Sequence, residues 1–305
     1  HDPFGDVFAR LDPEQFQRCF IEWVQSVARA TQGEAGPMDG TAERRSQDRT
    51  LGKHAIQMVN VWASANSLAL GQAKVEKKSN GITAISKLLQ LLDLTGCIVT
   101  VDATGGQIEI ARKIVEARAD YLLAVKKSQG QLYDDVRDLF EGAEEFDYQG
   151  VPHDFARTVH KNHGRLETRK CWVITDPYCL EYLQDRQQWA NLNTVVKVTV
   201  QRKTVTETTV QTRYYISSLA GPAKKFLEAT SRYWGIGNSL HWSLDVTFRE
   251  DHNRVRKDHG PQNLVVLRRI ALNLLEQETT LKQGIQDKQA RAERTEDYLL
   301  EVPLG

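Results

Sequence analysis

The sequence predicts an α/β protein in which a mixed sheet is flanked by helices and interrupted by a β-rich insertion. A continuous apolar, β-branched run at residues 97–105, CIVTVDATG, is typical of a buried central strand. Segments with helical spacing precede and follow this run, so strands and helices alternate along the chain. Farther on, residues 172–219 hold several runs of β-branched residues in alternation, which predict the insertion.

The first element that the sequence predicts is a helix over residues 12–30. Asp12 suits its N-cap, and Pro13 suits the first helical position. Apolar side chains then recur every three or four residues, which gives the helix one face for the core. These side chains are Phe16, Phe20, Trp23 and Val27.

The remaining elements follow from apolar periodicity and from turn residues between the periodic segments. In chain order, the expected strands span residues 54–64, 67–76, 97–105, 121–127, 172–175, 193–203 and 206–219. The expected helices span residues 82–94, 107–119, 131–141 and 263–276, with helical texture from 222 onward. The tail after Gln277 is charged and poorly patterned, so we expect it to fray.

The composition is that of a globular chain and excludes several classes of protein. Of 305 residues, 40% are hydrophobic and 26% are charged, and the 40 basic and 40 acidic side chains balance, so net charge indicates no partner. No apolar run approaches the roughly 20 residues that span a bilayer, and no signal peptide opens the chain. We therefore expect a soluble, cytoplasmic protein. The first residue, His1, indicates a chain without its natural start.

The four cysteines show neither CxxC pairing nor histidines at zinc-finger spacing. Cys171 and Cys179 are close enough in sequence to staple a loop. In a reducing cytosol, buried free thiols are the favoured interpretation.

Two aspartates lie where an α/β sheet presents side chains to a ligand. Asp39 ends the first short strand, before Gly40, and Asp102 ends the central strand. Ligands of open sheets gather at the carboxyl ends of strands, and hard cations such as Mg²⁺ prefer carboxylate oxygens, so the pair is a candidate metal site. Asp-Gly and Asp-Ala-Thr-Gly are also ordinary turn sequences, and spacing alone favours that interpretation.

Basic residues gather in three places. They are residues 157–170, the triplet Arg254, Arg256 and Lys257, and the pair Lys126 and Lys127. The first place carries five basic side chains against one acid, Glu167, with two histidines among them. Such patches can neutralise the phosphates of a nucleic acid, although charge runs are more often solvated faces.

The segment WGIGNSLHWSLDVTFREDHNRVR, residues 234–256, has an unusual composition. Trp234 and Trp242 are eight residues apart and share a broad helical face, which is typical of core packing. His241 fits a satisfied polar residue better than a metal ligand.

Seven runs occur in order over residues 1–276. They are MDG, VEKKSNGITAI, LTGCIVTVDATGGQ, ADYLLAVKKSQGQL, HGRLETR, RYYISSL and WGIGNSLHWSLDVTFREDHNRVRKDHGPQNLVVLRRIALNLL. Together they resemble the H-repeat-associated (ISAs-type) family of bacterial insertion-sequence transposases, which are DDE enzymes. The opening helix resembles only the end of the N-terminal accessory domain of that family.

The resemblance implies a ribonuclease H-like core with a β-rich insertion, and two-metal phosphodiester chemistry on DNA. The two metal-binding aspartates of the family match Asp39 and Asp102, which are the implied catalytic residues and the implied ligands of Mg²⁺ or Mn²⁺. The implied partners are double-stranded DNA, as transposon ends and target, and further copies of the chain in a homo-oligomer. The expected DNA contacts are Lys126, His163, Arg165, Arg169, Lys170, Arg254, Arg256 and Lys257.

The third carboxylate of the family is the glutamate of a Trp-Gly-Ile-Glu-Asn run, and here that position is Gly237. Asp245 lies eight residues on, about 12 Å along a helix, and Glu250 lies farther, so neither reaches the same metal pair. The chain also departs from the usual family residues at other motif positions. These positions are Thr41, Gly81, Gly106 and Ser128.

Two hypotheses follow from these residues. The first is a Mg²⁺-dependent DNA transposase that is weak or inactive, and the second is a DNA-binding or oligomerising relic without catalysis. A protein-binding module is a third alternative that no sequence feature supports. The expected domains are a remnant of the accessory domain at 1–33, the core at 34–145 and 221–276, the insertion at 146–220 and the charged tail at 277–305.

Overall fold

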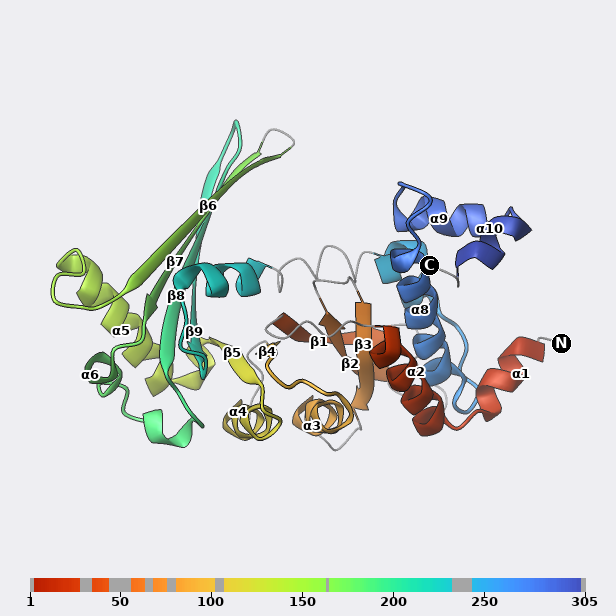
Figure 1. Cartoon of the computed structure of the whole chain (residues 1–305), viewed down its shortest axis with the longest axis horizontal. Helices are drawn as coiled ribbons and strands as arrows, with labels where there is room; N and C mark the ends of the chain where they lie inside the picture. The colour runs from red at the N-terminus through yellow and green to blue at the C-terminus, as the bar shows by residue number, and fades with distance from the viewer. Residues whose placement is uncertain are drawn as a thin grey trace. The chain divides into compact units, whose positions relative to one another are not determined.

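A computed structural model describes residues 3–27, 35–43, 56–63, 68–75, 81–101, 107–162, 165–231 and 243–302. By compactness the chain divides into two units, the first His1–Asp93 with Trp234–Gly305, the second Leu94–Tyr233. Each unit has its own strands and helices (Figure 1). The domain boundaries expected from the family resemblance stay a prediction.

The first unit combines antiparallel strands with helices from both ends of the chain. Strand β2 (Ile56–Ala63) pairs with both β1 (Ala35–Glu43) and β3 (Leu68–Val75). The helices are α1 (Pro3–Arg10), α2 (Pro13–Val27), α3 (Gly81–Leu91), α8 (Gly260–Gln277), α9 (Ile285–Ala292) and α10 (Glu296–Glu301). Helices α2, α3 and α8 all pack on β3, so both ends of the chain share one core.

Side-chain hydrogen bonds to the backbone set the ends of these elements. The Asp12 carboxylate accepts from the N–H groups of Glu14 at 2.9 Å and Gln15 at 2.8 Å, which confirms the predicted N-cap of α2. Asn273 of α8 accepts from the N–H of Ala69 at 2.8 Å and donates to its carbonyl at 2.9 Å. Ala69 adjoins a register shift between β2 and β3, so Asn273 satisfies the β3 backbone beside a bulge.

The second unit contains a mixed sheet whose described strands run in the order β4-β5-β9-β8-β7-β6. Strands β4 (Ile98–Val101) and β5 (Asp120–Val125) are parallel and are connected through α4 (Gln107–Glu116), because parallel neighbours need a crossover. The other pairs are antiparallel. The remaining strands are β6 (Asp154–Asn162), β7 (Arg165–Ile174), β8 (Thr194–Lys203) and β9 (Thr208–Ser217).

Helix α5 (Gln131–Glu145) packs on the inner part of this sheet. Its Phe140 stacks on Tyr214 of β9 with ring centroids 6.0 Å apart, and Glu144 forms a 2.6 Å ion pair with the buried Lys197 of β8. A second helix, residues 223–231, is tied to β6 where the N–H of Ala223 donates to the Asp154 carboxylate at 2.7 Å. The short helix α6 (Pro177–Leu180) follows β7.

The predicted segment of residues 157–170 is where secondary structure departs most from the sequence analysis. Sequence patterning identifies it only as a basic patch, whereas the structure shows β6 and the first half of β7 there. Charged side chains lie on both faces of these strands, so the alternation of apolar and polar residues that marks a half-buried strand is missing. In the helical segment predicted after 222, the structure describes a helix at 223–231 and a π-helical turn at Ser243–Thr247, and residues 232–242 lie outside the described part of the chain.

The tail after Gln277, predicted to fray, is instead folded as α9 and α10. Leu275, Tyr298 and Val302 form a buried cluster, with Leu281 and Ile285 packed against it. These few apolar residues are spread over two short helices, too thinly to give a readable period. The prediction of a frayed tail is therefore wrong.

The cysteines are free thiols, and Cys171 and Cys179 are buried, as the favoured interpretation predicts. Burial in apolar surroundings raises the pKa of the Cys171 thiol, so that thiol stays protonated. Within the described ranges, no helix combines the length and apolar character that a bilayer crossing requires.

Candidate functional site

The parallel strands β4 and β5 end at the same edge of the sheet. All four residues of β4 are buried, as predicted for a central strand, and Val101 lies opposite Leu123 of β5. Because the strands run in the same direction, their carboxyl ends lie at the same edge of the sheet. Lys126 follows β5 there and is exposed, whereas Asp102, the next residue in sequence after β4, lies outside the described part of the chain.

A short turn holds the backbone at Lys126. Its N–H donates to Oε1 of Gln129 at 2.7 Å, and the N–H of Gln129 donates to the Lys126 carbonyl at 2.9 Å. Gly130 then adopts a φ of 51°, a conformation that side chains disfavour, and the chain enters α5. The position of Lys126 after β5 is therefore set by local hydrogen bonds.

Asp39 lies inside β1 rather than at its end. It pairs with Asn60 of β2, and the pairing continues through Gly40 to Glu43. The prediction that the strand ends at Asp39 is therefore wrong. A neighbouring strand that continues the ladder overrides the turn preference of the Asp-Gly pair.

The predicted third acidic position, Gly237, lies outside the described residues, as do Trp234 and His241. Beyond this segment, Ser243–Thr247 forms a π-helical turn. Glu250 is buried, and its carboxylate contacts the guanidinium groups of Arg269 and, at 3.9 Å, Arg268. That carboxylate is thus committed to the core of the first unit.

Strands β6 and β7 carry the basic segment, and strand alternation divides its side chains between two faces of the sheet. Arg165, Glu167 and Arg169 share one face. Lys170 lies on the opposite face, directly across from Arg157 of β6. His163 lies outside the described residues.

Glu167 gathers the arginines on its face. Its buried carboxylate accepts from Nε of Arg169 at 2.7 Å and from Nε of Arg202 of β8 at 2.8 Å, and Nη2 of Arg165 lies 4.0 Å away. Burial by itself raises the pKa of Glu167, but the hydrogen bonds and charges of Arg202 and Arg169 outweigh it and lower the pKa. Within the HGRLETR run, Glu167 therefore joins β7 to β8.

The third basic group lies in the loop before α8, where Arg254, Arg256 and Lys257 are exposed. Nζ of Lys257 contacts the Asp6 carboxylate of α1 at 2.6 Å, and this hydrogen bond lowers the pKa of Asp6. One member of the predicted DNA-binding triplet thus ties the loop to α1.

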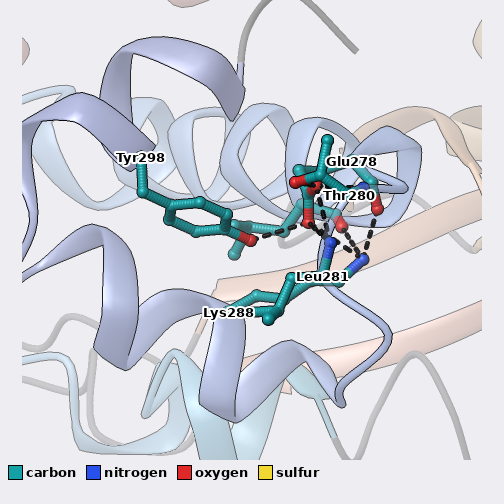
Figure 2. A network of polar contacts seen from close by, with 6 residues as sticks. Glu278, Thr280, Leu281, Lys288 and Tyr298 are labelled. Atoms are coloured by element: carbon teal, nitrogen blue, oxygen red, sulfur yellow. Dashed lines mark hydrogen bonds and ion pairs between the residues drawn. The ribbon is translucent and has the colours of Figure 1, made fainter.

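A third buried carboxylate, Glu278, was not identified from the sequence (Figure 2). It accepts from the N–H and hydroxyl of Thr280, from the N–H of Leu281 at 3.1 Å and from the hydroxyl of Tyr298 at 2.7 Å. Nζ of Lys288 lies 3.6 Å from the carboxylate and donates to the Leu275 carbonyl at 2.9 Å. The one local sequence signal for this network is a glutamate that directly follows a helix and precedes two threonines. That signal is weak.

The Glu278 network has a structural role and is not a reactive site. Burial by itself raises the pKa of Glu278, but the bonds from Thr280, Tyr298 and Leu281 outweigh it and lower the pKa to about 2. Burial, together with the hydrogen bond to Glu278, raises the pKa of Tyr298 to about 12. Both groups therefore keep one protonation state across neutral pH, and the network holds α9 and α10 on α8.

Metal ligands do not gather in the part of the chain that the structure describes, where no three His, Cys, Asp or Glu side chains form a set. Asp102 and Gly237 fall outside that part. The predicted Asp39 and Asp102 pair therefore stays a prediction.

Comparison with known proteins identifies the chain's relatives. A family model described as a transposase DDE domain matches residues 26–274. The chain is 38% identical to "Putative transposase YncI" of Escherichia coli O157:H7, over 99% of this chain and 77% of that protein. It is 34% identical to "H repeat-associated putative transposase YhhI" of Escherichia coli K12, over 100% of this chain and 80% of that protein.

Among solved structures, a piggyBac transposase synaptic complex with hairpin DNA aligns with 85% of this chain and 57% of that chain. The identity is 9% and the TM-score is 0.37, which is too low to carry an argument.

A mixed α/β chain that matches this model over most of its length belongs to the transposase DDE domain family. Its relatives include proteins named as H repeat-associated transposases, which confirms the resemblance found in the sequence runs.

Proposed function

We propose that the protein is a DNA-binding member of the transposase family whose cleavage and joining of DNA strands is impaired. Family membership over residues 26–274 supports DNA as the partner. The single observation behind the impairment is Gly237, which stands where the resemblance places the third catalytic carboxylate. The proposal includes a ribonuclease H-like arrangement of the core.

Asp39 and Asp102 are the residues that would hold Mg²⁺ or Mn²⁺. Carboxylate oxygens are the ligands that these ions prefer, and Asp102 directly follows the fully buried β4. Position 237 offers no side-chain ligand, so the donor set fits a two-ion site only in part. Bound ions in such sites stabilise charge on the reacting phosphate and oxygens.

Other residues of the chain would position the DNA. Lys126 follows β5 at the edge that Asp102 shares by topology, where an ammonium group suits a phosphate. Glu250 does not replace the missing carboxylate, because Arg269 and Arg268 already occupy it.

Metal binding without DNA tests the incomplete site. The protein, Asp39→Ala and Gly237→Glu are each titrated with Mn²⁺ and Mg²⁺ while thermal unfolding is followed, because a ligand of the folded state raises the Tm. We expect Gly237→Glu to gain more stability than the natural chain, and Asp39→Ala to gain none. Equal gains for the natural chain and Gly237→Glu contradict the impairment.

Strand cleavage gives the second readout. With Mn²⁺ and a DNA duplex, Gly237→Glu should cleave faster than the natural chain, and adding Asp102→Ala to it should abolish the gain. Equal cleavage rates for the natural chain and Gly237→Glu would show that Gly237 does not impair catalysis.

A non-catalytic relic that binds DNA or oligomerises is the second candidate. The basic residues of β6 and β7 that accompany the lost carboxylate favour it. It predicts salt-sensitive DNA binding that survives Asp39→Ala and Asp102→Ala, with no cleavage by Gly237→Glu. Light scattering with and without DNA tests the homo-oligomer, which stays a proposal.

A further inference from the structure

The outer halves of four strands form a regular patch of sheet, here called the outer arm. It comprises residues 157–161 of β6, 166–170 of β7, 199–203 of β8 and 208–212 of β9. Residues at the two ends of the patch pair in register across all four strands. Figure 1 shows these strands as long hairpins that extend past α5.

Strand alternation gives the outer arm two faces of different chemistry. One is the Glu167 face, where Arg169 and Arg202 are bound to the buried carboxylate. The other is here called the open face. It consists of Arg157, Val159, Lys161, Leu166, Thr168, Lys170, Thr199, Gln201, Lys203, Thr208, Val210 and Thr212.

The open face is basic and has no carboxylate among its twelve residues. Arg157, Lys161 and Lys203 are exposed, and Lys170 is half-buried. None of these four side chains forms an ion pair or hydrogen bond with a residue that the structure describes. Among the described residues, these four charges therefore have no acidic partner, whereas Arg169 and Arg202 share the single negative charge of Glu167.

The register places these charges in two rows. Arg157 and Lys170 are direct cross-strand neighbours, and Lys161 and Lys203 flank Leu166 four residues farther out. At about 3.3 Å per residue the rows lie about 13 Å apart, comparable to the roughly 12 Å width of the DNA major groove. Like charges directly opposite each other destabilise a sheet, so the Arg157–Lys170 pair is a cost that an anionic partner relieves.

Exposed apolar residues on the open face do not form a protein-docking patch. Val159 is 48% exposed, Leu166 39% and Val210 64%, but each is bordered by threonine or a basic residue. Two of the three, Val159 and Val210, are β-branched and suit an exposed strand. Charge, and not apolar area, is what distinguishes this face.

We infer that the open face of the outer arm binds the phosphate backbone of double-stranded DNA, and that the Glu167 face does not. This inference rests on the proposed DNA binding and names the surface responsible. It divides the basic segment that the sequence analysis treats as one patch. Lys170 contacts DNA together with Arg157, Lys161 and Lys203. Arg165 and Arg169 lie on the other face, beside Glu167.

The test compares variants of the full chain binding a short labelled duplex of mixed sequence across a salt series. The open-face variant carries Arg157→Gln, Lys161→Gln, Lys170→Gln and Lys203→Gln. If each residue contacts one phosphate, the slope of log affinity against log salt falls by about 3.6. The loss of affinity between 50 and 200 mM salt then shrinks about 100-fold relative to the natural chain.

Two control variants distinguish an effect of the open face from an effect of net charge alone. The matched variant Arg112→Gln, Arg118→Gln, Lys224→Gln and Lys282→Gln makes the same change in net charge at exposed positions off the arm. The variant Arg165→Gln with Arg169→Gln alters the Glu167 face. Both should keep a slope within about one of the natural chain.

The outcomes distinguish the inference from the function on which it rests. If the natural chain shows no salt-dependent binding, DNA binding itself fails. If it binds and the open-face variant matches the off-arm control, or the Glu167-face variant loses more, only the inference fails. If the fourfold variant does not fold, two double variants decide the question. They are Arg157→Gln with Lys170→Gln, and Lys161→Gln with Lys203→Gln. Each should lower the slope of log affinity against log salt by about 1.8.

Discussion

Glu167 in the second unit and Glu278 in the first are both buried carboxylates whose pKa lies below the ordinary range, yet their partners differ. Glu167 is held by two guanidinium groups, and the side chain of Arg202 is 42% exposed. Glu278 is held by hydroxyl and N–H groups and by Lys288, whose side chain is 9% exposed. Partners that reach water tolerate the loss of a carboxylate better than partners enclosed in the protein.

Removing the enclosed carboxylate should have the largest effect. Glu278→Ala removes the ion-pair partner of the Lys288 ammonium and leaves the Tyr298 and Thr280 hydroxyls and two N–H groups without their acceptor. We expect a loss of about 3 kcal/mol or more in the free energy of unfolding. Urea denaturation measures it. The exposed Glu293→Ala serves as a control with a change below about 0.5 kcal/mol. If Glu278→Ala and Glu293→Ala lost equal free energy of unfolding, Glu278 would not be holding α9 and α10 on α8.

Acid should weaken the same contact. The pKa of Glu278 is about 2 in the folded chain against an ordinary 4.5, so its contribution is complete above pH 4.5 and is lost as pH falls toward 2. Urea denaturation at a series of pH values should show a smaller loss of stability over this window in Glu278→Gln than in the natural chain. The pKa of Glu167 is lowered in the same direction, so some acid sensitivity remains in the variant.

The more open carboxylate should matter less to stability. Glu167→Gln removes charge-assisted hydrogen bonds to Arg169 and Arg202, and we expect a loss of about 1.5 kcal/mol. Hydrogen exchange should rise in β7 and β8 more than in β4 and β5. Glu207→Gln, an exposed acid between β8 and β9, is the matched control. A loss as large as that of Glu278→Ala would overturn the comparison.

Removing one of the several donors to the Glu278 carboxylate should have the smallest effect. Tyr298→Phe removes the 2.7 Å bond from its hydroxyl to Glu278 and keeps the ring in the cluster, so we expect a loss of about 1 kcal/mol. Thermal unfolding of this variant and Glu278→Ala, singly and together, measures the coupling of the two residues. Strict additivity would mean that the bond does not contribute.

Sequence patterning succeeds where the cause is local. The N-cap at Asp12, the buried β4 and the strands β8 and β9 each follow from residues within one element. It fails for β6, where both faces carry charge, and at Asp39, where a partner strand decides how far β1 runs. Of the candidate site, Lys126 can be placed by strand order, while Asp102 and Gly237 are known by sequence alone.

By itself, the sequence determined the family, the alternation of strands and helices and the glycine at position 237, because family runs and periodicity are properties of neighbouring residues. Only the tertiary structure decided which charged side chains are paired with one another. The partners are far apart in sequence: Glu167 and Arg202 are separated by 35 residues, Glu278 and Tyr298 by 20, and Asn273 and Ala69 by 204. Such partners are chosen by sheet register and helix packing, and burial then makes each contact strong enough to shift a pKa or join two elements.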